Sequence, residues 1–216
     1  MNWSLNELEA LSKKAARGIG LDWGLAEETG KATRWLCAAG WPAADTLAAL
    51  LSRNDGLGYD TLRPRDLETP WTASGGLLCP LISGALISDL AQNWADGTAA
   101  ELGATAFPVM LLPYMAWAAD GTGTPLELCW PGVRITRING QTHVSGEDAA
   151  VLVDRTAHVR VQKTSHAADR RVRRGYRAEV SQAAANVLNS YAQRTYAPET
   201  EQSRLSGAGA GLNDND

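Results

Sequence analysis

Five arginines occur within eight residues of the segment RRVRRGYR: Arg170, Arg171, Arg173, Arg174 and Arg177. The planar guanidinium group of arginine binds a carboxylate or a phosphate through paired hydrogen bonds. On a helix, positions three and four residues apart share one face, so Arg170, Arg173, Arg174 and Arg177 would lie together. The segment therefore predicts a site for an anionic ligand. The alternative that stays open is a solvated helix face whose charge is balanced by acidic residues near the end of the chain.

Histidine is the natural acid-base candidate near neutral pH, and His143 lies in a segment that predicts a hairpin. The segment VRITRINGQTHV, residues 133–144, has alternating runs on both sides of Asn139-Gly140, the preferred two-residue hairpin turn. This register sets Thr136 opposite His143 on a face shared with Arg134. Such a face could form the floor of a ligand site, or it could be the solvent side of a sheet.

Two further segments could contribute to the same site. Residues 54–76 are rich in turn residues and predict a long loop that carries Arg63 and Arg65. The segment SRLSGAGAGLNDND, residues 203–216, alternates glycine with alanine and ends with Asp214 and Asp216. We expect an ordered glycine-rich tail that returns to the body near the arginines; the alternative is a loose polar end.

Motifs that would assign a reaction are absent from the sequence. There is no phosphate-binding loop, no Gly-x-Ser-x-Gly elbow, no His-Glu-x-x-His helix and no dinucleotide fingerprint. The three cysteines, Cys37, Cys79 and Cys129, are widely spaced and form no metal-binding motif. We expect no cofactor and no metal ion, and the catalytic residues, if there are any, cannot be assigned.

The elements that would position these residues predict an α+β protein. Helical periods cover residues 4–18, 22–39 and 43–52, and a fourth helix follows the loop with Pro80 in its first turn. Strand patterns follow in FPVMLL, LELCW, the hairpin and AHVRVQK, and they predict an antiparallel meander. A helical period then returns after His166 and continues to Pro198, so a long C-terminal helix is expected. We expect one domain over 1–216, with a helical part at 1–96, a strand-rich part at 104–165, and the C-terminal helix and tail at 168–216.

Composition restricts the classes of partner. The chain of 216 residues has a net charge of -4, which argues against a nucleic-acid binder. The longest apolar stretch is interrupted by Pro108 and Pro113 and is too short for a membrane helix. The N-terminus lacks the basic and apolar regions of a signal peptide, so a soluble cytoplasmic protein is expected. Eight Trp and five Tyr suit a ligand cleft or a subunit interface, because one end of each ring can be buried and the other wet.

Three blocks of sequence together resemble a known family: GLAEETGKATRWL, GLLCPLISGAL and the closing SRLSGAGAGLNDND. As a set, they are similar to the bacterial domain-of-unknown-function family numbered 3726, over about residues 4–216. The resemblance implies a single-domain soluble bacterial protein and carries over no catalytic residue. It also implies that the tail is part of the domain.

Two functional hypotheses follow. The first is a protein that binds or converts a small anionic metabolite at a site that combines the arginine face, the loop around Arg63 and Arg65, and the carboxylates of the tail. The second is a non-catalytic accessory or oligomeric subunit, such as a homodimer, that uses its tryptophan-rich surface to join a partner. An arginine-lined pocket would favour the first hypothesis, and a flat apolar patch with several aromatic rings would favour the second.

Overall fold

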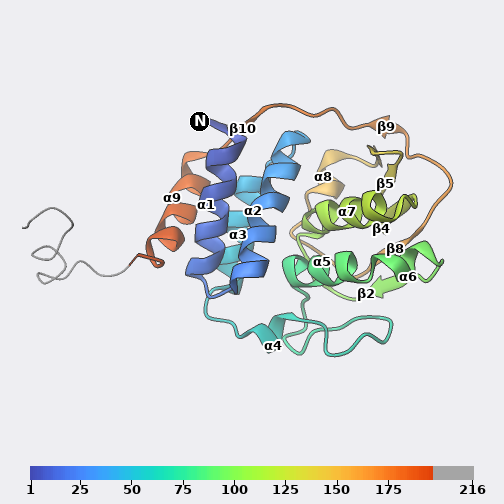
Figure 1. The fold of residues 1–216 in the computed structure, drawn as a ribbon. Helices are drawn as coiled ribbons and strands as arrows, with labels where there is room; N and C mark the ends of the chain where they lie inside the picture. The colour runs from blue at the N-terminus through green and yellow to red at the C-terminus, as the bar shows by residue number, and fades with distance from the viewer. Residues whose placement is uncertain (197–216) are drawn as a thin grey trace, which may run out of the picture.

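The computed structural model describes residues 1–196, and the predicted tail at 203–216 lies outside these residues. The described chain is an α+β fold, as the sequence predicts, with a helical half beside a half built on a sheet (Figure 1). The helical half contains α1, α2, α3 and α9, at Leu5–Gly18, Trp23–Ala38, Ala43–Asn54 and Gln182–Gln193.

The helices begin where their capping residues predict. Ser4 and Glu7 form the expected capping box, and the Asp22 carboxylate accepts a hydrogen bond from the backbone of Leu25 at the start of α2. Pro80 is the first residue of α5, where its missing N–H costs nothing. The shorter helices of the described chain are α4, α5, α6 and α8, at Tyr59–Leu62, Pro80–Asp89, Ala91–Ala95 and Asp148–Val151.

The main sheet has six strands in the order β2-β8-β4-β5-β6-β9, and all pairs are antiparallel. The predicted hairpin is confirmed: Thr136 lies opposite His143, and Asn139 and Gly140 both have positive φ. In chain order, the strands of this sheet are Ala100–Leu102, Leu126–Trp130, Val133–Ile138, Gln141–Ser145, Val159–Lys163 and Arg170–Arg171. Two small sheets pair β1 (Asn2–Ser4) with β10 (Arg177–Glu179) and β3 (Thr105–Ala106) with β7 (Arg155–Thr156).

Helix α7 (Leu112–Thr122) covers one face of this sheet, and it shows that the strand prediction for FPVMLL was wrong. The segment forms a 3₁₀ turn at Pro108–Leu111 that continues directly into α7. A short, continuously apolar run has no period that separates a buried strand from a buried helix. Here Pro108 and Pro113 stand in first-turn positions of the two helical segments, which their fixed φ favours.

The prediction of a long C-terminal helix was also wrong in its first half. Residues 168–181 are extended, and α9 begins only at Gln182, with Ser181 as its capping residue. The arginines therefore do not share a helical face. In this segment β9 pairs with β6 and β10 pairs with β1. These tertiary strand pairings override the local helical preference of the sequence.

We call residues 164–181 the strap, because they join the two halves of the fold along one side (Figure 1). The strap first follows the sheet, where the backbone N–H of Val172 donates to the carbonyl of Thr142. It then reaches the helical half, where the N–H of Gly175 donates to the carbonyl of Ala38 at the end of α2. These two contacts hold the basic residues of the strap across the boundary between the two halves.

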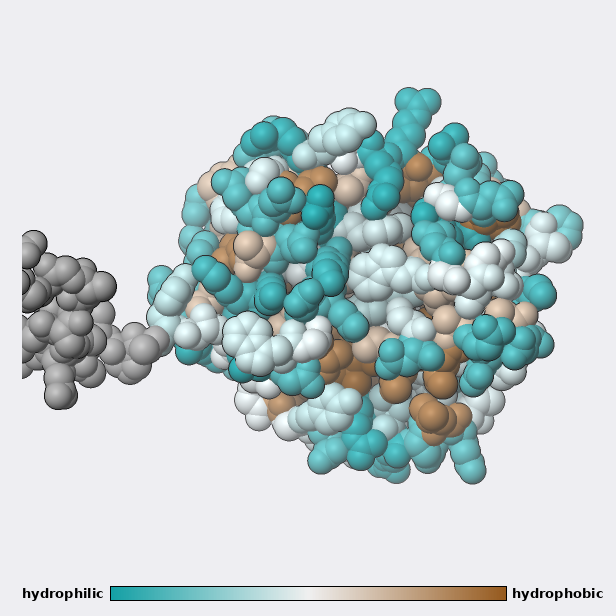
Figure 2. Space-filling view, in the orientation of Figure 1, coloured by the Kyte–Doolittle hydropathy of each residue, from teal (hydrophilic) through white to brown (hydrophobic). Residues whose placement is uncertain are grey.

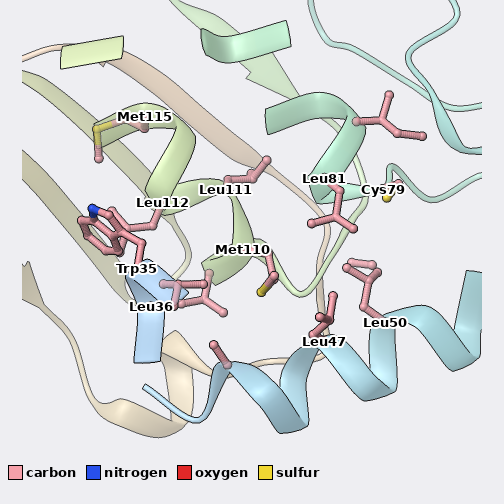
Figure 3. Packing of buried hydrophobic residues seen from close by; sticks show 14 of the residues in the cluster. Trp35, Leu36, Leu47, Leu50, Cys79, Leu81, Met110, Leu111, Leu112 and Met115 are labelled. Atoms are coloured by element: carbon pink, nitrogen blue, oxygen red, sulfur yellow. The ribbon is translucent and has the colours of Figure 1, made fainter. Parts of the chain in front are cut away.

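One hydrophobic cluster continues from the helical half into the sheet half. In Figure 3, Leu47 and Leu50 of α3 are directed toward Met110 and Leu81, and Trp35 of α2 lies near Leu112 of α7. Buried apolar surface of this kind is the main favourable contribution to folding, so the two halves pack as a continuous interior. Among residues 1–196, no helix combines the length and the hydropathy that a membrane crossing requires.

Candidate functional site

A hollow of about 1140 Å³ lies where the strap passes between α2 and the β5–β6 hairpin. We call it the arginine pocket. Its wall from the helical half is the last turn of α2 and the residues after it, and its wall from the sheet half is the hairpin. The strap supplies the third wall. The lining residues are Trp35, Ala39, Gly40, Arg137, Gly140, Gln141, Thr142, Arg170, Arg171, Val172, Arg173 and Arg174.

Arg137 is the best-positioned cation of this pocket. Its side chain is only 9% exposed, and it donates to both carboxylate oxygens of Asp120, over 2.9 Å from Nε and 2.6 Å from Nη2. Its Nη1 donates to Oγ1 of Thr142 over 3.0 Å. This paired geometry holds the guanidinium in one orientation at the pocket wall.

The strap arginines are exposed and have few partners. Arg170 pairs with Asp148 over 3.2 Å, and Arg174 lies over the ring of Trp35 at 5.3 Å from the ring centre. Within residues 1–196, no carboxylate pairs with Arg171, Arg173 or Arg174. Five arginines thus line the pocket and two of them have acidic partners, so the described structure leaves three positive charges uncompensated by a direct ion pair.

Other residues of the predicted site lie elsewhere. Arg63 pairs with Asp60 beside α4, and neither Arg63 nor Arg65 lines the arginine pocket. Arg177 donates to the carbonyl of Asn2, where β10 pairs with β1. Asp214 and Asp216 lie outside the described residues.

His143 does not line the arginine pocket, although its neighbours Gln141 and Thr142 on the same strand do. His143 is next to Arg171 across the β6–β9 pair, and its Nδ1 is buried with no hydrogen-bond partner among the described residues. The hairpin register was predicted correctly, yet His143 is not among the residues that line the arginine pocket.

The outer face of the sheet carries a second polar cluster around Glu127. Its carboxylate accepts hydrogen bonds from Nε of Arg134 over 2.8 Å and from the side-chain amide of Gln162. Burial acts to raise the pKa of Glu127, but the hydrogen bonds from Gln162 and Arg134 outweigh it and hold this pKa below its ordinary value. Beside it, burial and the Glu127 charge raise the pKa of the Cys129 thiol to about 11, so this thiol is a poor nucleophile at neutral pH.

Among the described residues that line the arginine pocket, there is no carboxylate, histidine or cysteine. The lining offers guanidinium groups, a side-chain amide, a hydroxyl and the Trp35 ring. These groups can hold an anion by charge and hydrogen bonds. None of them is an ordinary proton acceptor near neutral pH, so the geometry suits binding better than acid-base chemistry.

The block GLAEETGKATRWL lies within α2 and includes Trp35, which lines the arginine pocket. Residues 3–77 match the family described as a protein of unknown function, DUF3726. The resemblance stated from the sequence is confirmed for this segment, whereas the blocks after residue 77 lie beyond it. The DUF3726 segment supplies the wall of the pocket from α2, and the hairpin and strap follow it in the chain. No curated protein and no solved structure matches the chain.

Two residues that shape the arginine pocket were not predicted from the sequence. One is Arg137, and its signal was readable: on a face with Val133 and Ile135, an arginine interrupts an apolar series and needs a buried partner. The other is Trp35, which looks like a core residue of α2 and is indeed only 7% exposed. Its position in the pocket wall becomes evident only in the folded structure, where Arg174 of the strap lies over its ring.

Proposed function

We propose that this protein binds a small anionic metabolite in the arginine pocket. The observation that supports the proposal is the convergence of five arginines on one hollow while only two have a carboxylate partner among the described residues. Like charges that are held close together repel one another, so an anion that enters the pocket lowers the electrostatic free energy of the protein. A ligand with two negative charges would compensate most of the three uncompensated cations.

The pocket has the chemistry and about the size of a metabolite site. Its volume of about 1140 Å³ is slightly above the range of about 300–1,000 Å³ that is typical of small-molecule sites. Arg137 is held rigidly by Asp120, and the strap arginines can adjust to the ligand. The strap arginines are exposed, so water and salt weaken each contact, and we expect a plain anion to bind weakly and in a salt-dependent manner.

A thermal-shift titration of the full chain with pyrophosphate, citrate and inorganic phosphate tests the proposal. Chloride at matched ionic strength is the reference, because it screens charge without a bidentate geometry. A ligand that binds only the folded state raises its stability by about 2.7 kcal/mol at a hundredfold excess over Kd. We expect at least one of the three anions to raise the melting temperature above the chloride reference.

Two matched variants locate the effect. Arg173→Gln removes a positive charge from the pocket, and Arg65→Gln removes one from the exposed loop outside it. We expect the anion-induced shift to fall in Arg173→Gln and to stay unchanged in Arg65→Gln. Equal shifts in both variants and the wild type, or no shift beyond chloride with any anion, would refute the proposed site.

The alternative of an accessory or oligomeric subunit has its own supporting observation. Leu57 and Tyr59 are about half exposed and line a small hollow with residues 19–22, and the next residue, Trp23, is 68% exposed. Exposed apolar side chains that gather at one end of a fold are typical of protein interfaces. If this surface forms a homodimer, the wild type sediments as a dimer and Trp23→Ala sediments as a monomer; a monomeric wild type excludes the homodimer.

We also propose a cytoplasmic location. All three cysteines are free thiols, with Cys37 and Cys79 buried and Cys129 partly buried. Burial raises the pKa of both the Cys37 and the Cys79 thiol, which keeps them protonated and unreactive. Reduced, unpaired cysteines are usual in proteins of a reducing compartment.

A further inference from the structure

A second hollow of about 590 Å³ adjoins the arginine pocket, and the hydrogen-bonded residues Gly175 and Ala38 belong to its lining. The two hollows share two residues, Trp35 and Arg174. We call the second one the aromatic pocket, because three of its lining residues are Trp35, Trp117 and Tyr176. The other lining residues are Leu5, Glu9, Lys31, Arg34, Ala38, Arg174 and Gly175.

The charges of the aromatic pocket are already paired, in contrast to those of its neighbour. Arg34 pairs with Glu9 over 2.8 Å, and Lys31 pairs with Glu27 over 2.8 Å. Of the other lining residues, only Arg174 carries a charge, and it is shared with the arginine pocket. A ligand therefore meets cations that already have carboxylate partners here, whereas three cations of the arginine pocket have none among the described residues.

The aromatic rings of this pocket are placed to contact a flat group. Trp117 lies on α7 and packs edge-on against Tyr114, with ring centres 5.1 Å apart at an interplanar angle of 73°, which fixes its orientation. Tyr176 is on the strap and is 92% exposed, so its ring is free to lie over a ligand. Figure 2 shows pale side chains of intermediate hydropathy near the middle of the face drawn there, with hydrophilic side chains mainly on one side and hydrophobic side chains below them.

We infer that the metabolite is an aromatic anion: its negatively charged group lies in the arginine pocket, and a flat ring attached to that group lies in the aromatic pocket. This inference rests on the proposed function and adds the chemical class of the ligand. Aromatic side chains hold flat rings by stacking, with little dependence on the identity of the ring. Arg174 stacks on Trp35 between the two pockets and would contact both parts of the ligand.

Methyl phosphate and phenyl phosphate form a probe pair that carries the same charge and differs in the ring. We would titrate each into the full chain by calorimetry. We expect phenyl phosphate to bind about tenfold more tightly, which is the gain typical of one stacked ring. Trp117→Ala should bring the two affinities to within about twofold, since the ring loses its fixed wall.

Tyr176→Ala is the second variant, because removing a side chain that is almost fully exposed does not threaten folding. It should also reduce the preference for phenyl phosphate and leave the affinity for methyl phosphate unchanged. Arg173→Gln, in contrast, should weaken both probes by the same factor, because Arg173 lines only the arginine pocket.

The outcomes separate this inference from the proposed function. If both phosphates bind the wild type with equal affinity, the aromatic inference fails and the anion site stands. A preference for phenyl phosphate that persists in both Trp117→Ala and Tyr176→Ala places the ring elsewhere and also overturns the inference. If neither phosphate binds the wild type, the proposed function fails, and the inference fails with it.

Discussion

Replacing Asp120 by asparagine should lower the stability of the protein and at the same time strengthen anion binding. Asp120 accepts two hydrogen bonds from Arg137, whose side chain is 9% exposed, while the Asp120 side chain is 40% exposed. Removing one partner of a buried pair costs about 3–5 kcal/mol, and an exposed pair contributes about 0–1 kcal/mol. This half-buried pair lies between these limits, so we expect a loss of about 2 kcal/mol.

For a chain of this size, that loss corresponds to a melting temperature lower by about 4–8 °C. Asp148→Asn is the matched control. It removes a carboxylate partner from another pocket arginine, Arg170, but both side chains of that pair are largely exposed. The control should therefore change stability by less than about 0.5–1 kcal/mol.

Anion binding should change in the opposite direction, because Asp120 repels any anion that contacts Arg137. Two unit charges roughly 7 Å apart interact by about 0.6 kcal/mol in water and by about 2.4 kcal/mol near a protein surface. Asp120→Asn should therefore bind pyrophosphate roughly threefold to sixtyfold more tightly than the wild type at low salt. Added salt should reduce this difference.

The assay is a pyrophosphate titration of both proteins by calorimetry, with melting curves recorded with and without the anion. The reasoning fails if Asp120→Asn is destabilised and also binds pyrophosphate more weakly than the wild type. In that case Asp120 would act by holding Arg137 in place for the ligand, and its charge would not oppose binding. An unchanged melting temperature would show instead that the ion pair between Asp120 and Arg137 contributes little to folding.

Two further predictions concern the interior. Gly84→Ala on α5 should lower stability by about 2 kcal/mol in urea melts, because the added Cβ would lie 2.3 Å from the fully buried ring of Tyr114. Its control is Gly121→Ala on α7, where nothing lies within 4 Å of the added Cβ. The control should leave stability unchanged or raise it. Burial and the Glu127 charge raise the pKa of Cys129 to about 11, so its thiol should react with iodoacetamide at pH 8 about a hundredfold more slowly than in an unfolded control. The rate should increase as the pH rises toward 11. Equal alkylation rates in folded and unfolded protein would contradict the second prediction.

The helical half and the hairpin could be predicted because their signals are local. The Ser4–Glu7 box, the Asp22 cap and the Asn139-Gly140 turn each act over a few residues, and each occurs as expected. The strap could not be predicted in this way. Its pairing with β6 joins His143 to Arg171, 28 positions away, and its pairing with β1 joins residues near opposite ends of the chain. Long-range edge pairing of this kind leaves no periodic mark on the paired segment.

The sequence therefore predicted only a part of the residues that line the candidate pocket, and not their geometry. Arg170, Arg173 and Arg174 do lie together, but in an extended segment, and Arg171, which a helix would have placed apart from them, joins them. The partners from the DUF3726 segment and the hairpin, Trp35 and Arg137, could be assigned only after the tertiary fold was known. The cluster of positive charges was visible in the sequence, whereas the residues of α2 and the hairpin that form the pocket with it were not.

Under the proposed function, the extended form of the strap also links its folding to the ligand. Four arginines within the five residues 170–174 of the strap repel one another, and this repulsion opposes docking of the strap between the two halves. The hydrogen bond from Gly175 to Ala38 and the β1–β10 pair hold the strap against that repulsion. An anion in the arginine pocket removes part of the repulsion and contacts α2, the hairpin and the strap together. Ligand binding and closure of the strap therefore stabilise each other, and a bound anion should slow exchange of the Gly175 amide proton with solvent.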